Sequence, residues 1–259
     1  VARNEQMHRQ IQEVKKKGRE TQQKTRLRIP KLKDCKFHIG DKWPRQLEKR
    51  DTMIFLTEGD SAAGSPEVCR DVKCQAIFAL RGKPMNCYGE KFDKIYSNEE
   101  LTFLMQALGI EDDIENLRYD KVVIATDADV DGLHIRNLLI TYFLCFFEQL
   151  VLSGHLYVLE TPLFRVQRPK EKPIYCYSEA ERDSAAAKLG KKAEITRFKG
   201  LGEISPKEFG QFIGEEIKLQ PVTLENMRNV PELLGFFMGS NTPKRREYIM
   251  NNLEVHKYE

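Results

Sequence analysis

The sequence predicts an α/β fold, in which a parallel sheet is flanked by helices and followed by a helical carboxyl-terminal tail. Short apolar runs alternate with segments of helical character, which is typical of parallel strands joined by crossover helices. Two of these runs end close to acidic residues, and parallel sheets place their binding sites at the carboxyl ends of strands. The chain has 259 residues, 41% hydrophobic and 31% charged, as expected of a globular protein with a sizeable core.

Four apolar runs are the expected strands of the sheet. Each run is short and is bounded by charged or turn-forming residues. The first run leads into Glu58-Gly59-Asp60-Ser61, which we interpret as a tight turn that starts a helix with Asp60 or Ser61 as its cap. The expected strands cover residues 53–57, 76–80, 121–126 and 155–160.

Helices are expected between and after these strands. Residues 97–108 form one, with Ser97 as the N-cap and a glutamate three positions later. Residues 133–152 form a long helix that is apolar nearly all round, and is therefore buried or covered by a partner. In the tail, Ser205-Pro206-Lys207-Glu208 is a capping box, and Thr242-Pro243 begins another helix.

The amino-terminal segment is strongly basic. Residues 1–36 hold 12 Lys and Arg against 4 Asp and Glu, a local charge of +8 in a chain whose net charge is only +3. A basic arm beside an acidic body suits a polyanionic partner. The same pattern also fits a solvated, partly helical leader, so residues 1–33 are expected to be a charged helix followed by a linker.

The cysteines and the apolar runs bear on the cellular compartment. The six cysteines form no C-x-x-C pair, and the spacing of Cys69 and Cys74 is too wide for a usual zinc knuckle. The amino terminus does not resemble a signal peptide, and the longest apolar run, residues 138–147, is too short to span a bilayer. We therefore expect a reduced, cytoplasmic protein without a membrane partner.

Three aspartates stand at alternate positions directly after the third apolar run. In an extended chain the side chains of Asp127, Asp129 and Asp131 share one face, where three carboxylates are costly without a cation. A calcium loop of the EF-hand type is disfavoured because Leu138 occupies its twelfth position. Asp131 also breaks the pattern of an aspartyl phosphotransferase. A hard metal ion is the preferred interpretation, and a loop of solvated aspartates is the remaining alternative.

Two further motifs contain glycines beside charged residues. Glu58 at a strand end, followed by small residues up to Gly64, suits a general acid or base or a metal ligand. The run Arg197-Phe198-Lys199-Gly200-Leu201-Gly202-Glu203 suits a close approach to phosphate. Taken singly, each motif fits an ordinary turn better than a functional site.

Together the motifs resemble a known family. EGDSAAGS, LRGKPMN, TDADVDGLHIR, TPLFRV and RFKGLGEI are similar to sequences of the B subunits of bacterial type IIA DNA topoisomerases, and the resemblance covers about residues 20–255. It implies a Toprim fold, which has a Rossmann-like parallel sheet. FLTEGDSA, LRGKPMNCYG and CYSEAER are closer to the topoisomerase IV branch than to the gyrase branch, which stays the alternative.

The resemblance also implies a division into domains. Residues 1–50 would be the end of a transducer domain and a basic linker, and residues 51–165 the Toprim core. Residues 166–259 would be the Toprim continuation and a helical tail. The chain has no glycine-rich ATP lid, so we expect a fragment that uses ATP only through an amino-terminal domain it lacks.

The family assigns a catalytic metal site to matching positions. Glu58, Asp127 and Asp129, with Asp131 more peripheral, would hold Mg²⁺, for which Mn²⁺ or Ca²⁺ can substitute. Glu58 is also the candidate general acid or base. The expected function is to support double-strand DNA cleavage and religation during ATP-dependent strand passage, with decatenation and relaxation as outcomes. A gyrase subunit that supports supercoiling, or a docking module inert on its own, are the alternatives.

The resemblance further implies partners. The nucleophilic tyrosine would come from an A subunit in an A2B2 heterotetramer, so the chain alone should not cleave DNA. The phosphate neighbours in DNA would be Arg81, Lys83, His134 and Lys199, and quinolone-type inhibitors would contact Asp60 and Arg81.

One position departs from the pattern of the family. Ala63 replaces the first of two paired glycines that relatives usually carry after EGDSA. The added methyl group leaves Glu58 unchanged, but we expect that it can alter the entry into the helix and nearby inhibitor contacts.

Overall fold

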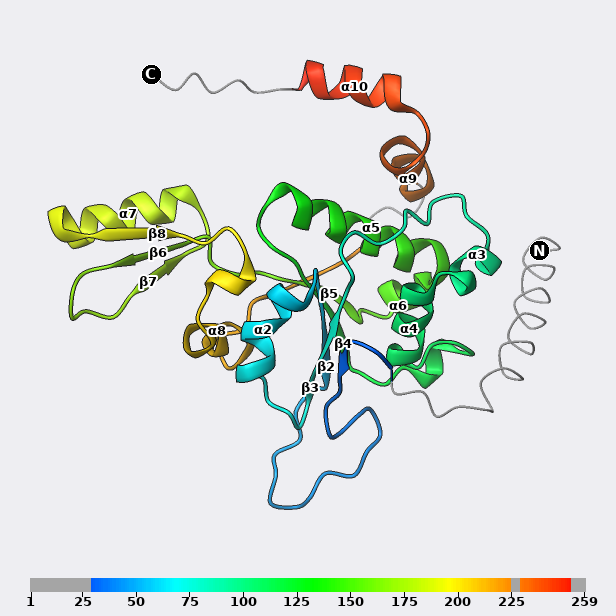
Figure 1. Ribbon diagram of the computed structural model, residues 1–259, viewed down its shortest axis with the longest axis horizontal. Coiled ribbons are helices and arrows are strands. Elements are labelled where there is room, and N and C mark those ends of the chain that lie inside the picture. Colours follow the sequence, from blue (N-terminus) through cyan, green and yellow to red (C-terminus); the bar gives the residue numbers. More distant parts are fainter. Residues whose placement is uncertain (1–28, 225–228, 253–259) are drawn as a thin grey trace.

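A six-stranded sheet forms the centre of the computed structural model, which describes residues 29–224 and 229–252 (Figure 1). The four inner strands are parallel, and the two edge strands run antiparallel to their neighbours. The strands, in spatial order, are β1 (Leu32–Lys33), β3 (Gln75–Ala79), β2 (Met53–Thr57), β4 (Lys121–Ala125), β5 (Leu156–Leu159) and β9 (Leu219–Pro221). The predicted α/β fold is confirmed, and each expected strand lies within one or two residues of its observed bounds.

The inner strands are buried on both faces because helices cover each side of the sheet (Figure 1). Ile54, Leu56 and Ile124 face a larger core cluster, while Phe55 and Val123 face a smaller one on the opposite side. Such continuous apolar runs are typical of parallel strands. The larger cluster is covered by four helices, α3 (Phe92–Ser97), α4 (Glu99–Leu108), α5 (Val130–Phe146) and α6 (Glu148–Leu152). The smaller one is covered by α2 (Asp60–Cys69) and α8 (Pro206–Ile213).

Helix α2 (Asp60–Cys69) begins directly after the turn that follows β2. Gly59 is its N-cap residue and provides no side-chain cap, so the expected cap at Asp60 or Ser61 is wrong. Both residues lie inside the first turn, and the Asp60 carboxylate forms an ion pair with Lys31 instead of capping the helix. Ala63 is buried in the smaller core cluster.

The expected helix at 97–108 is divided into α3 (Phe92–Ser97) and α4 (Glu99–Leu108). Asn98 caps α4, because its side chain accepts a hydrogen bond of 3.0 Å from the Leu101 N–H. Ser97 ends α3, and its hydroxyl donates to the Lys94 carbonyl. The expected N-cap is therefore displaced by one residue.

The expected long helix is also divided, into α5 (Val130–Phe146) and α6 (Glu148–Leu152). It begins three residues early because the Asp129 carboxylate accepts from the Gly132 N–H at 2.8 Å. The helix breaks at Phe147, whose ring lies 5.3 Å from the ring of Tyr142. The apolar surface of α5 mostly packs on the sheet, as its composition predicts.

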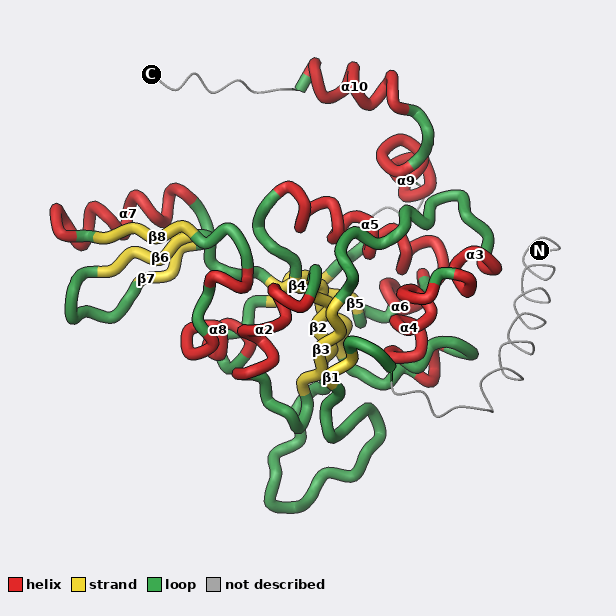
Figure 2. Tube along the Cα trace, viewed as in Figure 1, coloured by secondary structure: helices red, strands yellow, loops and turns green. Residues whose placement is uncertain are grey.

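A small separate unit, residues 164–197, projects from the main body (Figures 1 and 2). It has a three-stranded antiparallel sheet in the order β7-β6-β8, and α7 (Glu179–Leu189) covers one face of it. Its strands are β6 (Phe164–Gln167), β7 (Ile174–Cys176) and β8 (Glu194–Arg197). The sequence did not predict this sheet, because the strands are short and half exposed.

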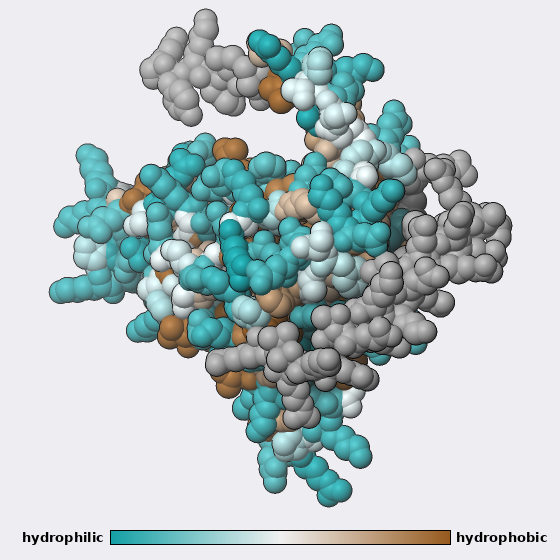
Figure 3. Space-filling view, turned by 45° about the vertical axis from the view of Figure 1, so that its right-hand side comes forward, coloured by the Kyte–Doolittle hydropathy of each residue, from teal (hydrophilic) through white to brown (hydrophobic). Residues whose placement is uncertain are grey.

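The carboxyl-terminal region is largely helical, as expected. Ser205 caps α8 (Pro206–Ile213), because its hydroxyl accepts a hydrogen bond from the Glu208 N–H at 3.4 Å. This is one of the two hydrogen bonds of the predicted capping box, so the serine cap is confirmed. Helix α9 (Val230–Met238) contacts the body, where the Asn86 side-chain amide donates to the Met238 carbonyl at 2.7 Å. Helix α10 (Thr242–Asn251) begins at the predicted Thr242 and projects beyond α9 (Figures 1 and 3). Strand β9 was not expected in this region.

Two predictions concern the chain beyond these elements. The charged helix expected within residues 1–33 lies almost wholly outside the described residues. Within residues 29–224 and 229–252, no helix is long and apolar enough to cross a bilayer. The six cysteines are free thiols.

Candidate metal centre

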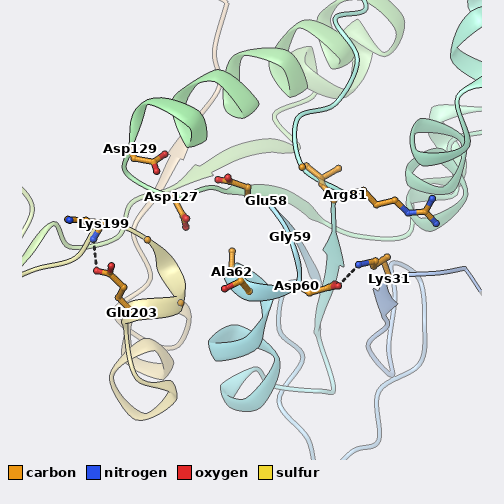
Figure 4. Close-up of a pocket in the computed structure, with 15 residues that line it drawn as sticks. Lys31, Glu58, Gly59, Asp60, Ala62, Arg81, Asp127, Asp129, Lys199 and Glu203 are labelled. Carbon is orange, nitrogen blue, oxygen red and sulfur yellow. Dashed lines mark hydrogen bonds and ion pairs between the residues drawn. The ribbon is translucent and has the colours of Figure 1, made fainter.

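Three carboxylates line one cleft where β2 and β4 end, although their oxygens do not all lie within 4.8 Å of one another. These neighbouring strands are parallel and in register, with Thr57 opposite Ala125, so the residues that follow them lie at the same edge of the sheet. Glu58 follows β2 directly, Asp127 follows β4 by two residues, and Asp129 is the N-cap of α5. All three line one cleft of about 760 Å³ (Figure 4). The structure thus brings together three of the predicted site residues.

Glu58 has an unsatisfied oxygen in this cleft. Its Oε2 atom is buried and has no hydrogen-bond partner. Burial raises the pKa of Glu58, and the negative charges of Asp127, Asp129 and Asp131 raise it further. A buried carboxylate oxygen without a donor is costly, so a cation or a proton is needed to compensate it.

Asp127 is held by backbone groups from two segments. The Leu201 N–H donates to its Oδ1 at 2.8 Å. On the other side, a Cβ at Gly132 would lie 2.1 Å from the carbonyl oxygen of Asp127, so only glycine permits this close approach of α5. Burial raises the pKa of Asp127, and the Leu201 hydrogen bond partly opposes that shift.

Asp131 lies apart from the other carboxylates. It belongs to the first turn of α5, its side chain is 61% exposed, and it forms an ion pair of 2.7 Å with Lys83. The hydrogen bond with Lys83 lowers the pKa of Asp131. The extended stretch ends at Asp129, so the expected convergence of three alternate aspartates holds for two of them. Asp131 therefore lies outside the cleft that Glu58, Asp127 and Asp129 line.

Basic side chains surround the cleft, but several are paired with acidic ones. Lys31, Arg81 and Lys199 line it, whereas Lys83 and His134 do not. Lys31 pairs with Asp60, and Arg81 extends away from the carboxylates to pair with Glu99 at 2.7 Å (Figure 4). His134 is exposed on α5.

Lys31 was missed by the sequence analysis. Its ion-pair partner lies 29 positions away, and β1, which places it, has only two residues. Neither the spacing nor the short strand gives a local signal for this contact. Ala63, in contrast, does not line the cleft.

A second cluster, Asp34, Cys35 and His38, has ligand-type atoms within 4.8 Å of one another. The Arg118 guanidinium already occupies it, forming an ion pair with Asp34 and a contact of 2.7 Å with His38 Nε2. The Tyr119 hydroxyl also donates to Asp34 Oδ1 at 2.6 Å. This cluster is a satisfied polar network, so the cleft is the better candidate for a metal.

The cleft suits a hard divalent cation. Its donors are carboxylate oxygens, which are the ligands that Mg²⁺ prefers, and the described cleft residues include neither histidine nor cysteine. The unsatisfied Glu58 Oε2 and the mutual repulsion of the acidic groups are the conditions that a bound cation relieves. The residues present therefore fit such an ion.

Comparison with known proteins gives consistent matches. Residues 53–161 match the Toprim domain, and residues 190–250 match the family described as DNA gyrase B, carboxyl terminus. The B subunit of DNA topoisomerase 4 from Borreliella burgdorferi is 58% identical over 254 residues, which are 98% of this chain and 42% of that protein. The B subunit of DNA gyrase from Halalkalibacterium halodurans is 37% identical, over 93% of this chain and 38% of that protein.

A solved structure agrees with the fold. The DNA-binding, cleavage and re-ligation domain of Plasmodium falciparum topoisomerase II matches with a TM-score of 0.73 and 26% identity, covering 91% of this chain and 33% of that one. The chain spans about two fifths of the length of the curated relatives described here. It therefore belongs to the family of bacterial type IIA topoisomerase B subunits, of which it comprises a Toprim domain and the carboxyl-terminal region.

Proposed function

We propose that this chain supplies the metal-binding half of a DNA cleavage centre in a type IIA topoisomerase of the topoisomerase IV branch. The observation that carries the proposal is that Glu58, Asp127 and Asp129 line one cleft, with a buried Glu58 oxygen left without a partner. The proposed reaction is double-strand cleavage and religation during strand passage, which relaxes or decatenates DNA. ATP would be used by a part of the full-length protein outside this chain.

Glu58, Asp127 and Asp129 would hold the metal ion, with Asp131 at its periphery. When bound, Mg²⁺ would neutralise these carboxylates and stabilise the oxyanion that leaves as the phosphodiester breaks, and Mn²⁺ or Ca²⁺ would be able to take its place. The raised pKa of Glu58 lets its carboxyl group hold a proton at a higher pH than an ordinary glutamate, which suits a general acid or base.

Basic residues near the carboxylates would bind DNA phosphates. Arg81 and Lys199 line the cleft, while Lys83 lies beside it through its pair with Asp131. His134, exposed on α5, would contact DNA farther from the cleavage point. Exposed ion pairs contribute little stability, so Arg81 and Lys83 can exchange their acidic partners for phosphates.

A second protein chain would supply the nucleophile. No tyrosine lines the cleft among the described residues, and in this proposal the attacking hydroxyl comes from another chain. Helix α9 is largely apolar yet has no buried residue, and Phe237 and Ile249 are 47% and 58% exposed. Such exposed apolar surface supports a protein partner, which we propose is the A subunit of an A2B2 heterotetramer in the cytoplasm.

Quinolone-type inhibitors would bind at the same cleft. Asp60 and Arg81 both line it, on the side where Lys31 approaches α2 (Figure 4). Ala63 points into the core rather than the cleft, which argues against a direct effect of this substitution on inhibitor contacts.

Reconstitution tests the proposal. The chain is mixed with a matched A subunit, supercoiled DNA, Mg²⁺ and a cleavage poison, and linear product is measured. Glu58→Ala or Asp127→Ala should reduce cleavage by at least about 10²-fold, the usual scale for a catalytic group. Glu48→Ala, at an exposed loop position, is the control. Cleavage within a few-fold of wild type for both site variants would exclude this assignment.

The same assay separates the alternatives. If the wild-type complex binds DNA and the A subunit without any cleavage, an inert docking module is favoured. Supercoiling with a matched A subunit, rather than decatenation, would favour the gyrase branch.

A further inference from the structure

The loop of residues 199–203, which follows β8 and includes the 3-10 turn η3 (Leu201–Glu203), contacts Asp127 through its backbone. The Leu201 N–H donates to Asp127 Oδ1 at 2.8 Å, across 74 positions of sequence. Its neighbour Gly200 lies against the other oxygen, since a Cβ built at Gly200 would be 2.6 Å from Asp127 Oδ2. Both carboxylate oxygens of Asp127 therefore meet this loop.

The 199–203 loop is itself firmly held. The Lys199 N–H donates to Glu203 Oε2 at 2.8 Å, which closes the loop on itself. A Cβ at Gly202 would lie 3.0 Å from the Ser61 carbonyl oxygen, so the loop packs closely on α2. The Leu201 side chain is only 2% exposed and belongs to the smaller core cluster. An amide fixed in this way can fix the carboxylate that it binds.

We propose that the 199–203 loop is a positioning device for Asp127. The Leu201 amide engages Oδ1 and sets the orientation of the carboxylate, which leaves Oδ2 as the oxygen offered to the cation. The absence of a side chain at Gly200 gives Oδ2 the room it needs. Gly200 and Leu201 are positioning residues, because they act through Asp127. The inference rests on the proposed function, which supplies the cation.

Proline at position 201 removes the amide donor with little disturbance of the backbone. Leu201 is the first residue of η3, where proline is tolerated, and Gly200 is extended with φ −140° and ψ 161°, as a residue before proline prefers. Leu201→Pro therefore removes the N–H. Leu201→Ala is the matched control, because it shortens the buried side chain and keeps the N–H.

The measurement is Mn²⁺ affinity of the 259-residue chain, by electron paramagnetic resonance without DNA. Leu201→Pro should weaken Mn²⁺ binding by about tenfold or more, the usual effect of losing a group that orients a metal ligand, while Leu201→Ala stays within a few-fold of wild type. Circular dichroism confirms that each variant is folded.

A second pair of variants makes the test independent of Leu201. Gly200→Ala should weaken Mn²⁺ binding by a similar factor, because its methyl group displaces Asp127 Oδ2. Gly64→Ala is the matched control, since a Cβ at this helical glycine would meet no atom within 4 Å. If Leu201→Pro fails to fold, this pair decides the outcome.

Asp127→Asn, measured in parallel, distinguishes two kinds of failure. If Asp127→Asn loses Mn²⁺ but Gly200→Ala and folded Leu201→Pro bind like wild type, the positioning role is wrong and the proposed function stands. If Leu201→Ala and Leu201→Pro weaken Mn²⁺ binding equally, the Leu201 amide does not position Asp127. If wild type and Asp127→Asn do not differ in Mn²⁺ affinity, the proposed metal centre itself fails, and this inference with it.

Discussion

The Asp34 carboxylate connects the segment before β2 to the rest of the protein through hydrogen bonds and an ion pair. It accepts a hydrogen bond from the Tyr119 hydroxyl at 2.6 Å, lies 3.0 Å from His38 Nε2 and forms an ion pair with Arg118. Burial would raise the pKa of Asp34, but the hydrogen bonds from His38, Tyr119 and Arg118 outweigh it and lower the pKa. The ionised form is therefore the one that the fold stabilises.

Asp34→Asn should reduce the free energy of unfolding by about 1–3 kcal/mol at pH 7. Because the pKa of Asp34 is lower in the folded state, its contribution is present above the unfolded value, about 4, and is lost as pH falls below that value. The difference between variant and wild type should thus shrink in acid. Urea unfolding followed by the fluorescence of Trp43, the single tryptophan, measures it.

Asp93→Asn is the control for this experiment, since Asp93 is an exposed carboxylate on α3. An Asp34→Asn effect of the same size at pH 7 and pH 3 would contradict the ionic role of Asp34.

At the scale of elements, the start of α4 gives a direct test of capping. Asn98→Ala should destabilise the protein by about 1 kcal/mol, because the Leu101 N–H loses its partner. Ser97→Ala, one residue away, should have a much smaller effect, since its hydroxyl only donates to the end of α3. Thermal unfolding of the two variants compares them. A larger loss for Ser97→Ala would reverse the assignment of the cap.

The four inner strands of the main sheet could be predicted because their signal is local. A short, continuous apolar run is itself the consequence of burial on both faces, so sequence and structure agree within one or two residues. Helix boundaries depend on more than the local run. Ser97 and Asn98 are both plausible caps by residue type, and only the packing of α3 against α4 selects Asn98. The break at Phe147, whose ring lies against that of Tyr142, likewise has no signal in the apolar run.

The candidate site was predictable to the extent that it follows strand ends. Glu58 and Asp127 come after adjacent parallel strands, so topology alone brings them together. The contacts of Lys31 with Asp60 and of Leu201 with Asp127 join distant segments, and no spacing in the sequence encodes them. Asp131 does not share a face with Asp127 and Asp129, because Asp129 caps α5 and the helix begins at Val130.

At the scale of the whole molecule, α9 and α10 carry exposed apolar side chains. Leu233 is 53% exposed and Met250 65%, beside Phe237 and Ile249. Phe237→Ser combined with Ile249→Ser should lower the affinity for the A subunit about tenfold or more, because buried apolar anchors dominate such interfaces. Isothermal titration calorimetry measures the affinity, and circular dichroism checks the fold.

Val72→Ser is the matched control, because Val72 is 57% exposed and follows α2. Unchanged affinity of the double variant for the A subunit would place the interface elsewhere on the molecule.

The amide that holds Asp127 lies 74 residues further along the chain, which has a consequence for biosynthesis. A ribosome completes β2, β4 and every carboxylate of the centre well before it reaches Leu201. If the proposed centre binds a divalent ion, the nascent chain carries its three carboxylates before the 199–203 loop exists, and it should capture that ion only weakly. Tight capture would begin only once the 199–203 loop has emerged from the exit tunnel and packed, so metal affinity would report that the chain has folded past residue 203.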